Sequence, residues 1–225
     1  MARRGAARAS ERQGLTVSTW QRSLFAILCA ALVASCISPP FPKQMALQHL
    51  PTLALLLALP FAARRIPLSD TAFTCLAAFL LLHILGARYI YSYVPYDRWS
   101  EALFGLSLTE AFGFRRNHYD RVVHFFFGAL WVRPAQEICT RTFRVPRRFS
   151  YYTAFEFVLA FSMLYELFEW SLTLVLSPTK AGAYNGEQGD IWDAHKDMSL
   201  ALAGACVSLL VMTLRNQYST KASSG

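Results

Sequence analysis

Three stretches of the chain place acidic and histidine side chains at spacings of about one helical turn. In "YDRVVHFFFG", Asp120 and His124 are four residues apart, and in "YELFEW", Glu166 and Glu169 are three apart. Each pair therefore shares one face of a helix. The third stretch, "NGEQGDIWDAHKDM", carries aspartates at spacings of three and four, namely Asp190, Asp193 and Asp197. All three stretches adjoin or interrupt apolar segments, where an ionised group costs at least about 2.5 kcal/mol at the bilayer centre.

Several carboxylates and one imidazole in a small volume are typical ligands of a divalent metal. Hard oxygen ligands suit Mg²⁺, Ca²⁺ or Mn²⁺, and a histidine among them also permits Zn²⁺. In this hypothesis the cation polarises an ester or phosphate oxygen, and His124 or Glu169 acts as the general base on a water molecule. The expected metal ligands are the remaining acids, Asp120, Glu166, Asp190, Asp193 and Asp197.

The composition indicates that the elements carrying these residues lie in a membrane. Of the 225 residues, 54% are hydrophobic and 16% are charged, which is too apolar for an ordinary soluble domain. The sequence therefore predicts an all-α polytopic membrane bundle over residues 20–215, with disordered tails at 1–19 and 216–225. Six segments approach the roughly 20 residues that a membrane span requires. They are Trp20–Ile37, Ala46–Ala63, Asp70–Tyr93, Tyr119–Cys139, Tyr151–Leu176 and Met198–Leu214.

The distribution of charge predicts the orientation of this bundle. Arginine and lysine, which give the chain a net charge of +8, concentrate before the first segment, in every second connection and after the last segment. The positive-inside rule then places both termini in the cytoplasm and the three acidic stretches near the outer leaflet, within about 15 Å of depth. The basic residues are not interleaved with aromatics in one polar stretch, so we expect a lipid bilayer as the partner and no nucleic acid.

Four further features complete these expectations. Arg88 and Arg121 could each supply positive charge to the acidic cluster. Glu137 is excluded from this cluster, because it is expected to extend toward the basic inner loop. "RWSEALFGL" predicts a short helix along the membrane surface. "LVASC", ending at Cys36, resembles a lipoprotein cleavage site, and cleavage there would remove the first span.

Other interpretations of the same residues stay open. Asp120 could act only as a charge at a helix N-terminus, His124 could be hydrogen-bonded within the bundle, and the aspartates could form a solvated loop. A proton-coupled transporter is one alternative function, since acids and histidines in spans serve proton relays. It would need acids at several depths. A structural or partner-binding membrane protein is the other alternative.

The three motifs, in this order on successive spans, resemble the YjdF-like family of bacterial inner-membrane proteins over about residues 22–215. They are more loosely similar to VanZ-like proteins, which pair D-x-x-x-H with acids on the next two spans and are linked to tolerance of glycopeptide antibiotics. The resemblance implies a multi-pass inner-membrane protein with a polar site facing outward. It supplies no reaction, and we expect a lipid or cell-envelope substrate. The residues to which it assigns the site are Asp120, His124, Glu166, Glu169, Asp190, Asp193 and Asp197.

Overall fold

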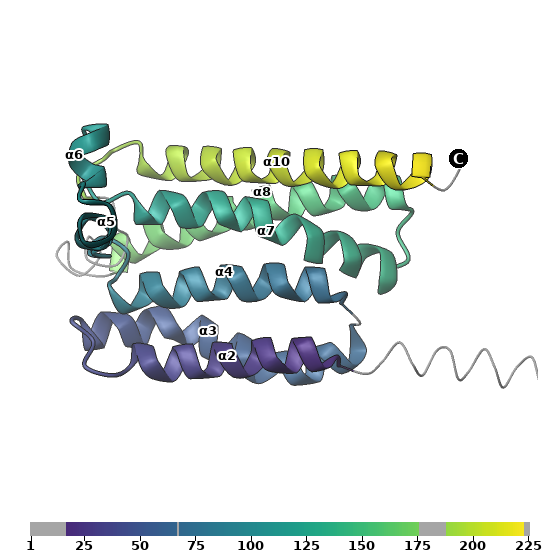
Figure 1. Cartoon of the computed structure of the whole chain (residues 1–225), viewed down its shortest axis with the longest axis horizontal. Coiled ribbons are helices and arrows are strands. Elements are labelled where there is room, and N and C mark those ends of the chain that lie inside the picture. Colours follow the sequence, from purple (N-terminus) through teal and green to yellow (C-terminus); the bar gives the residue numbers. More distant parts are fainter. Residues whose placement is uncertain (1–16, 67, 176–187, 223–225) are drawn as a thin grey trace, which may run out of the picture.

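A computed structural model describes residues 17–66, 68–175 and 188–222, in which helices are joined by short connections and no strand is present (Figure 1). The all-α prediction is confirmed. Two short helices, α5 (Tyr96–Phe104) and α6 (Leu108–Phe112), accompany six long ones. The long helices are α2 (Thr19–Ser35), α3 (Pro42–Arg65), α4 (Asp70–Arg88), α7 (Tyr119–Arg141), α8 (Arg147–Val175) and α10 (Asp193–Ala222).

The helix boundaries differ from the predicted ones by five residues or more only in α4 and α10. The third predicted segment extends to Tyr93, but α4 ends at Arg88 because Ile90 and Tyr91 adopt positive φ angles that a helix cannot contain. At the other end of the chain, α10 continues to Ala222, beyond the predicted boundary at residue 215. Residues 1–16 and the predicted end of the fifth span at Leu176 lie outside the described residues.

Four of the long helices, α3, α4, α8 and α10, are long and apolar enough to cross a membrane. Helix α2 is apolar but has only 17 residues. Helix α7 is long enough, but five charged residues lower its hydropathy. Six spans and cytoplasmic termini therefore stay predictions. The charged residues of α7 are Asp120, Arg121, Arg133, Glu137 and Arg141.

The long helices run back and forth between the two ends of one bundle (Figure 1). Helix α7 packs against α10, α8 and α4, and α4 in turn packs against α2 and α3. The three helices that carry the acidic motifs, α7, α8 and α10, therefore form one mutually packed group. The beginning of α2 and the end of α10 lie at the same end of the bundle, and α5 and α6 lie at the opposite end (Figure 1).

The contact between α7 and α10 depends on two glycines. A Cβ atom on Gly128 would lie 1.9 Å from the carbonyl oxygen of Ala201, and one on Gly204 would lie 2.0 Å from the carbonyl oxygen of Phe125. The two backbones therefore touch directly. Small residues allow this approach, as they commonly do between helices in membranes. The result fixes which residues of the first turns of α7 and α10 face each other.

The outer end of the bundle, as oriented by the charge distribution, carries α5 at the predicted "RWSEALFGL". Asp97 joins α5 to α6, because it accepts hydrogen bonds from the backbone N–H and the hydroxyl of Thr109, at 2.8 and 2.6 Å. Partial burial raises the pKa of Asp97, but the hydrogen bonds from Thr109 and Ser107 outweigh it and hold the pKa below its usual range. Leu103 and Phe104 are exposed, as an interfacial helix requires.

Two charged residues that the sequence raised lie outside the acidic cluster. Glu137 lies beside Arg141 at the start of the basic connection after α7, with Oε2 3.5 Å from its Nη2, as expected. It is nevertheless 2% exposed and also accepts hydrogen bonds from the backbone N–H and the hydroxyl of Ser69, at 2.8 and 2.6 Å. It thereby ties α7 to the first turn of α4. Arg88 does not reach the acidic cluster either, because it donates to carbonyl oxygens at the end of α2, including that of Ile37 at 2.9 Å.

Helix α2 is an integral part of the bundle. Leu28 is fully buried in a cluster that also contains Leu56 of α3 and Leu80 of α4. Ser18 begins the helix by accepting a hydrogen bond from the backbone N–H of Gln21 at 3.1 Å. Cleavage before Cys36 would remove this packed helix and expose the partners of Leu28, so the packing favours a retained first helix.

Candidate functional site

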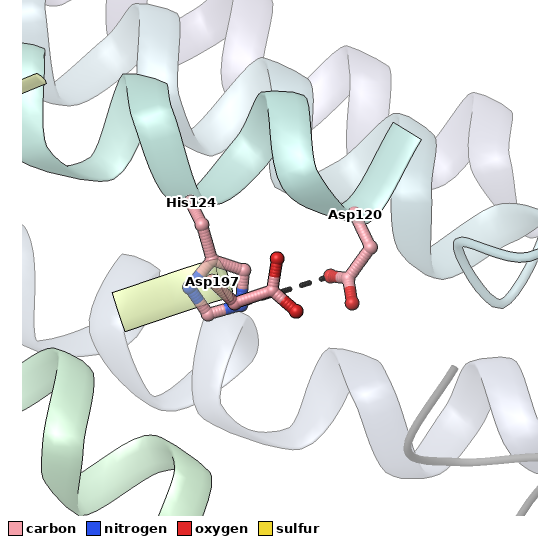
Figure 2. Close-up of side chains that lie close together, drawn as sticks. All are labelled: Asp120, His124 and Asp197. Atoms are coloured by element: carbon pink, nitrogen blue, oxygen red, sulfur yellow. Dashed lines mark ion pairs between the residues drawn. The ribbon is translucent and has the colours of Figure 1, made fainter. Parts of the chain in front are cut away.

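The first turns of α7 bring Asp120 and His124 to the interior of the bundle (Figure 2). Both side chains are buried. The Nε2 atom of His124 lies 3.8 Å from Oδ1 of Asp120 and 3.4 Å from Oε1 of Glu166 on α8. The shared face that the i, i+4 spacing predicts thus exists, and it meets α8 at the predicted acid.

Asp197, one turn into α10, joins this group (Figure 2). One ligand atom each from Asp120, His124 and Asp197 lies within 4.8 Å of the other two. Asp197 is 2% exposed, and its Oδ1 has no hydrogen-bond partner among the described residues. A buried carboxylate oxygen without a partner is costly.

The register of α7 against α10 explains the meeting of these side chains. On α7, Asp120, His124 and Gly128 follow one another at intervals of four residues, and on α10 Asp197 and Ala201 do the same. The contact of Gly128 with Ala201 therefore places His124 and Asp197, each one turn away along its helix, side by side.

Glu169 is the fifth member of what we call the inner cluster. It is buried on α8 and lies close enough to Asp120, Glu166 and Asp197 to interact electrostatically with all three. Four carboxyl groups within one small volume repel one another when ionised. The inner cluster is defined as Asp120, His124, Glu166, Glu169 and Asp197.

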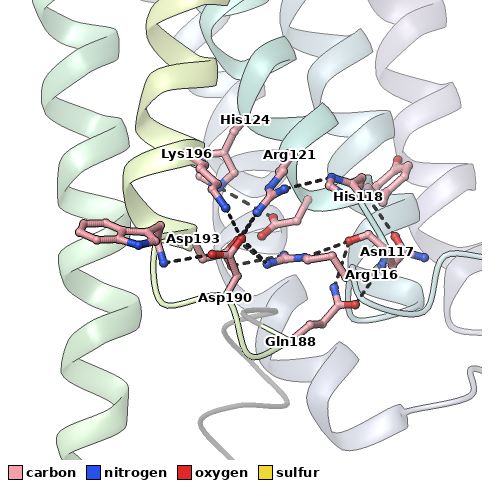
Figure 3. A network of polar contacts seen from close by, with 12 residues as sticks. Arg116, Asn117, His118, Arg121, His124, Gln188, Asp190, Asp193 and Lys196 are labelled. Atoms are coloured by element: carbon pink, nitrogen blue, oxygen red, sulfur yellow. Dashed lines mark hydrogen bonds and ion pairs between the residues drawn. The ribbon is translucent and has the colours of Figure 1, made fainter. Parts of the chain in front are cut away.

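The other two predicted ligands, Asp190 and Asp193, lie in a separate group that we call the outer network (Figure 3). Arg116 donates to both oxygens of Asp193, with Nη2 3.3 Å from Oδ2, and Arg121 contacts both aspartates. Lys196 donates to Oδ2 of Asp190 at 2.7 Å. These carboxylates are already balanced by protein cations, so we do not include them in the proposed ligand set. The outer network consists of Arg116, Arg121, Asp190, Asp193 and Lys196.

The positive charges of the outer network contribute to the pKa shifts of two groups, Asp190 and His118. The hydrogen bond from Lys196 is the largest of the effects that hold the pKa of Asp190 well below its usual range. Partial burial, followed by the nearby Arg121 and Arg116, lowers the pKa of His118, whose Nδ1 faces Arg121 at 3.2 Å. At neutral pH Asp190 is therefore ionised, and the neighbouring His118 is uncharged.

Sequence reasoning identified Arg121 as a possible counter-charge but missed Arg116 and Lys196. A signal for both was present. Arg116 belongs to "FRRNHYD", and Lys196 follows His195, so both lie in segments that the charge distribution assigns to the outer side, where basic residues are less common. The ion pairs explain the position of both cations: Arg116 pairs with Asp193 in a buried contact, and the exposed Lys196 pairs with Asp190. His195 is exposed and contacts the ring of Trp192.

A cavity of about 370 Å³ adjoins the inner cluster at Asp120 and His124. Helices α3, α4, α7 and α8 contribute to its walls, which are mainly apolar. Apolar walls with a few convergent polar groups are typical of a small-molecule site. The apolar residues that line it include Leu55, Leu80, Val123, Phe127, Trp131 and Phe161.

Apolar helices in one bundle, with a buried cluster of acids and a histidine near one end, define a multi-pass membrane protein. The family described as "Predicted membrane protein (DUF2238)" matches residues 20–218, and the chain belongs to this family. The chain is also similar to "Inner membrane protein YjdF" of Escherichia coli (strain K12), with 33% identity over 151 residues, which cover 67% of this chain and 68% of the relative. No solved structure shows a significant match. The resemblance to YjdF-like proteins and the inner-membrane location are confirmed.

Proposed function

We propose that the protein is a membrane-embedded, metal-dependent enzyme whose cation is held by Asp120, His124 and Asp197. The observation that carries this proposal is the convergence of three ligand atoms within 4.8 Å in a buried site where Oδ1 of Asp197 has no partner. A divalent cation would provide that partner and offset the repulsion between the carboxylates. Arginines already serve the same purpose for Asp190 and Asp193 in the outer network.

The ligand set is compatible with several metals. Two carboxylates and one imidazole suit Zn²⁺ and Mn²⁺, and the carboxylates alone would suit Mg²⁺ or Ca²⁺. Three protein ligands leave coordination positions for water and substrate, as in catalytic zinc sites. A cation there would polarise the ester or phosphate oxygen of a lipid or cell-envelope substrate.

In this proposal His124 is a metal ligand, and the general base comes from α8. Glu166, whose Oε1 lies 3.4 Å from Nε2 of His124, borders the metal position, and Glu169 lies one turn further along the same face. Either carboxylate would take a proton from the attacking water and return it to the leaving oxygen, which balances a hydrolysis. Replacement of Glu166 by Gln is expected to abolish the reaction while the fold is retained.

Metal analysis of the purified protein tests the proposal. We expect near-stoichiometric divalent metal in the wild-type protein after incubation with Mn²⁺ or Zn²⁺, and its loss in Asp197→Asn and His124→Ala. Glu156→Gln changes an exposed acid of α8 and is expected to retain the metal. Absence of metal from the wild-type protein, or its retention in both cluster variants, would contradict the proposal.

A bound metal is also expected to stabilise the fold. At a concentration one hundred times its Kd, a ligand that binds only the folded state contributes about 2.7 kcal/mol. Thermal unfolding in detergent should therefore shift upward with the metal in the wild-type and Glu156→Gln proteins. The shift should vanish in Asp197→Asn, and an equal shift in that variant would indicate binding elsewhere.

A further inference from the structure

The cavity beside the inner cluster contains hydrogen-bonding groups that no described residue satisfies. The hydroxyls of Thr52 and Ser162 and the indole N–H of Trp131 line the cavity, are buried and have no partner. Thr52 and Ser162 are each 2% exposed. A buried donor left unpaired costs about 1–3 kcal/mol. The two hydroxyls in one cavity therefore point to an occupant that pairs with them.

The chemistry of the three groups restricts the occupant. All three can donate a hydrogen bond, and the indole N–H can only donate. None of them carries a charge, so the complementary groups are neutral acceptors such as carbonyl or ester oxygens. Most of the other lining residues are aliphatic or aromatic, for example Leu80, Phe127 and Phe161. The remaining polar ones are Asp120, His83, His124, Tyr91 and Tyr165. The occupant must therefore be mainly hydrocarbon with a few acceptor oxygens.

The shape of the cavity restricts the occupant further. It follows α7 from Asp120 to Trp131, eleven residues that correspond to about 16 Å of helix. Helix α3 packs on α4, and α8 packs on α7, so the cavity lies between these two helix pairs. Ser162 lies about one turn from Tyr165, whose ring contacts His124. An elongated occupant would thus place one end at the inner cluster.

We propose that this cavity binds one acyl chain of a membrane phospholipid, with the head group at Asp120 and His124 and an ester oxygen at the hydroxyls of Thr52 and Ser162. The hydrocarbon then passes Trp131, whose indole N–H this occupant does not pair. This inference rests on the proposed function, because it names the substrate class of the same site. The acyl chain would contact the apolar walls along α7. The scissile bond would then lie in the head-group region, beside the metal ligands.

Photo-crosslinking in proteoliposomes tests the inference. The vesicles contain phosphatidylethanolamine and phosphatidylglycerol, with a small fraction of phosphatidylethanolamine that carries a diazirine on one acyl chain. We expect peptide mapping to find crosslinks at cavity residues such as Phe127 and Phe161. Ser162→Leu fills the cavity and removes a hydroxyl, so it should reduce these crosslinks several-fold. Leu167→Phe adds bulk at an exposed position of α8 and should leave them unchanged.

Two readouts keep the inference separate from the proposed function. Crosslinks confined to exposed positions such as Phe168, with none in the cavity, would overturn the acyl-chain inference even if the metal binds. Cavity crosslinks in a protein that binds no metal would support the acyl-chain site and reject the metal. Unfolding temperature and gel filtration identify any variant that fails to fold. If Ser162→Leu fails, Ser162→Ala, which removes only the hydroxyl, replaces it. We expect Ser162→Ala to reduce the cavity crosslinks by a smaller factor. Unchanged crosslinking in both folded variants would also overturn the inference.

Discussion

At the scale of single residues, the aspartates near the start of α10 divide according to what neutralises them. Asp190 and Asp193 face Arg116, Arg121 and Lys196, whereas Asp197 faces His124 and Asp120. The position of each aspartate along the chain explains the difference, because the side chains of these three cations contact the aspartates only at the start of α10. The proposed metal thus belongs to the one of these three aspartates for which the described residues provide no ion pair with an arginine or lysine.

Removal of Arg116 is expected to destabilise the fold. Asp193 is buried, and loss of one partner of a buried ion pair typically costs about 3–5 kcal/mol. Arg121 also contacts Asp193, so we expect Arg116→Met to fall at the lower end of this range. Arg115→Met, at the exposed neighbouring position, should change the unfolding free energy by less than about 0.5 kcal/mol. Equal effects of the two substitutions in chemical denaturation would contradict the pairing.

His118 is expected to make stability depend on pH. Arg121, Arg116 and Lys196 lower its pKa and Asp193 raises it, with burial as the largest effect, so the folded pKa lies below the ordinary value of 6.5. The unfolded chain then binds more protons between the two pKa values, and stability falls as the pH falls below about 6.5. Above that pH the contribution is constant. His118→Gln should weaken the pH dependence of unfolding between pH 5 and 7, and an unchanged profile would contradict this assignment.

At the scale of elements, α7 and α10 position the site through their glycine contact. Gly128 and Gly204 each touch the opposite backbone, and this contact aligns His124 with Asp197. Helix α8 adds its two glutamates because α7, α8 and α10 all pack on one another. The site is therefore a property of three helices, although each motif is local.

Substitution of either glycine is expected to separate α7 from α10. Gly128→Ala and Gly204→Ala each place a methyl group less than 3 Å from a backbone oxygen, where only a movement of the helices can relieve the contact. Overpacking of this kind costs about 1–3 kcal/mol. Ala203→Leu adds more volume at the exposed neighbouring position and should be tolerated. Thermal unfolding and metal content in detergent measure both effects. Wild-type values for the two alanine variants would contradict the close contact.

At the scale of the whole molecule, the described acids are distributed unevenly along the bundle. The inner cluster and the outer network lie near the end that carries α5 and α6, whereas Glu137 near the other end is bound by Ser69 and Arg133. A proton-coupled transporter would need titratable groups along a path between the two ends. Glu137 instead serves to hold α4 against α7, so the arrangement favours a site on one side over a relay.

The orientation of the bundle can be measured with the protein's own cysteine. Cys36 is exposed after α2, at the end that we expect to face outward. In a variant that retains Cys36 as the only cysteine, a membrane-impermeant maleimide should label intact spheroplasts. A cysteine introduced at Arg144, in the loop between α7 and α8, should react only after the membrane is disrupted. The reverse pattern would invert the predicted topology.

The sequence by itself determined the helical segments and the faces of the acidic motifs. Membrane-length apolar runs and i, i+4 spacings are local patterns, and backbone hydrogen bonding translates them directly into helices and helix faces. The pairs Asp120 with His124 and Glu166 with Glu169 therefore lie on the faces that the spacing predicts. The family resemblance also rested on these motifs, and it was confirmed over residues 20–218.

Only the tertiary structure decided which charges meet. The spacing of Asp190, Asp193 and Asp197 suggests one equivalent stripe, but the segment before α7 brings Arg116 against Asp193, and the glycine contact brings Asp197 against His124. The hydrogen bonds of Glu137 with Ser69 and of Arg88 with the end of α2 likewise arise from tertiary packing. Such contacts join residues about 50 to 80 positions apart, and their strength depends on distance and burial, which no local spacing encodes.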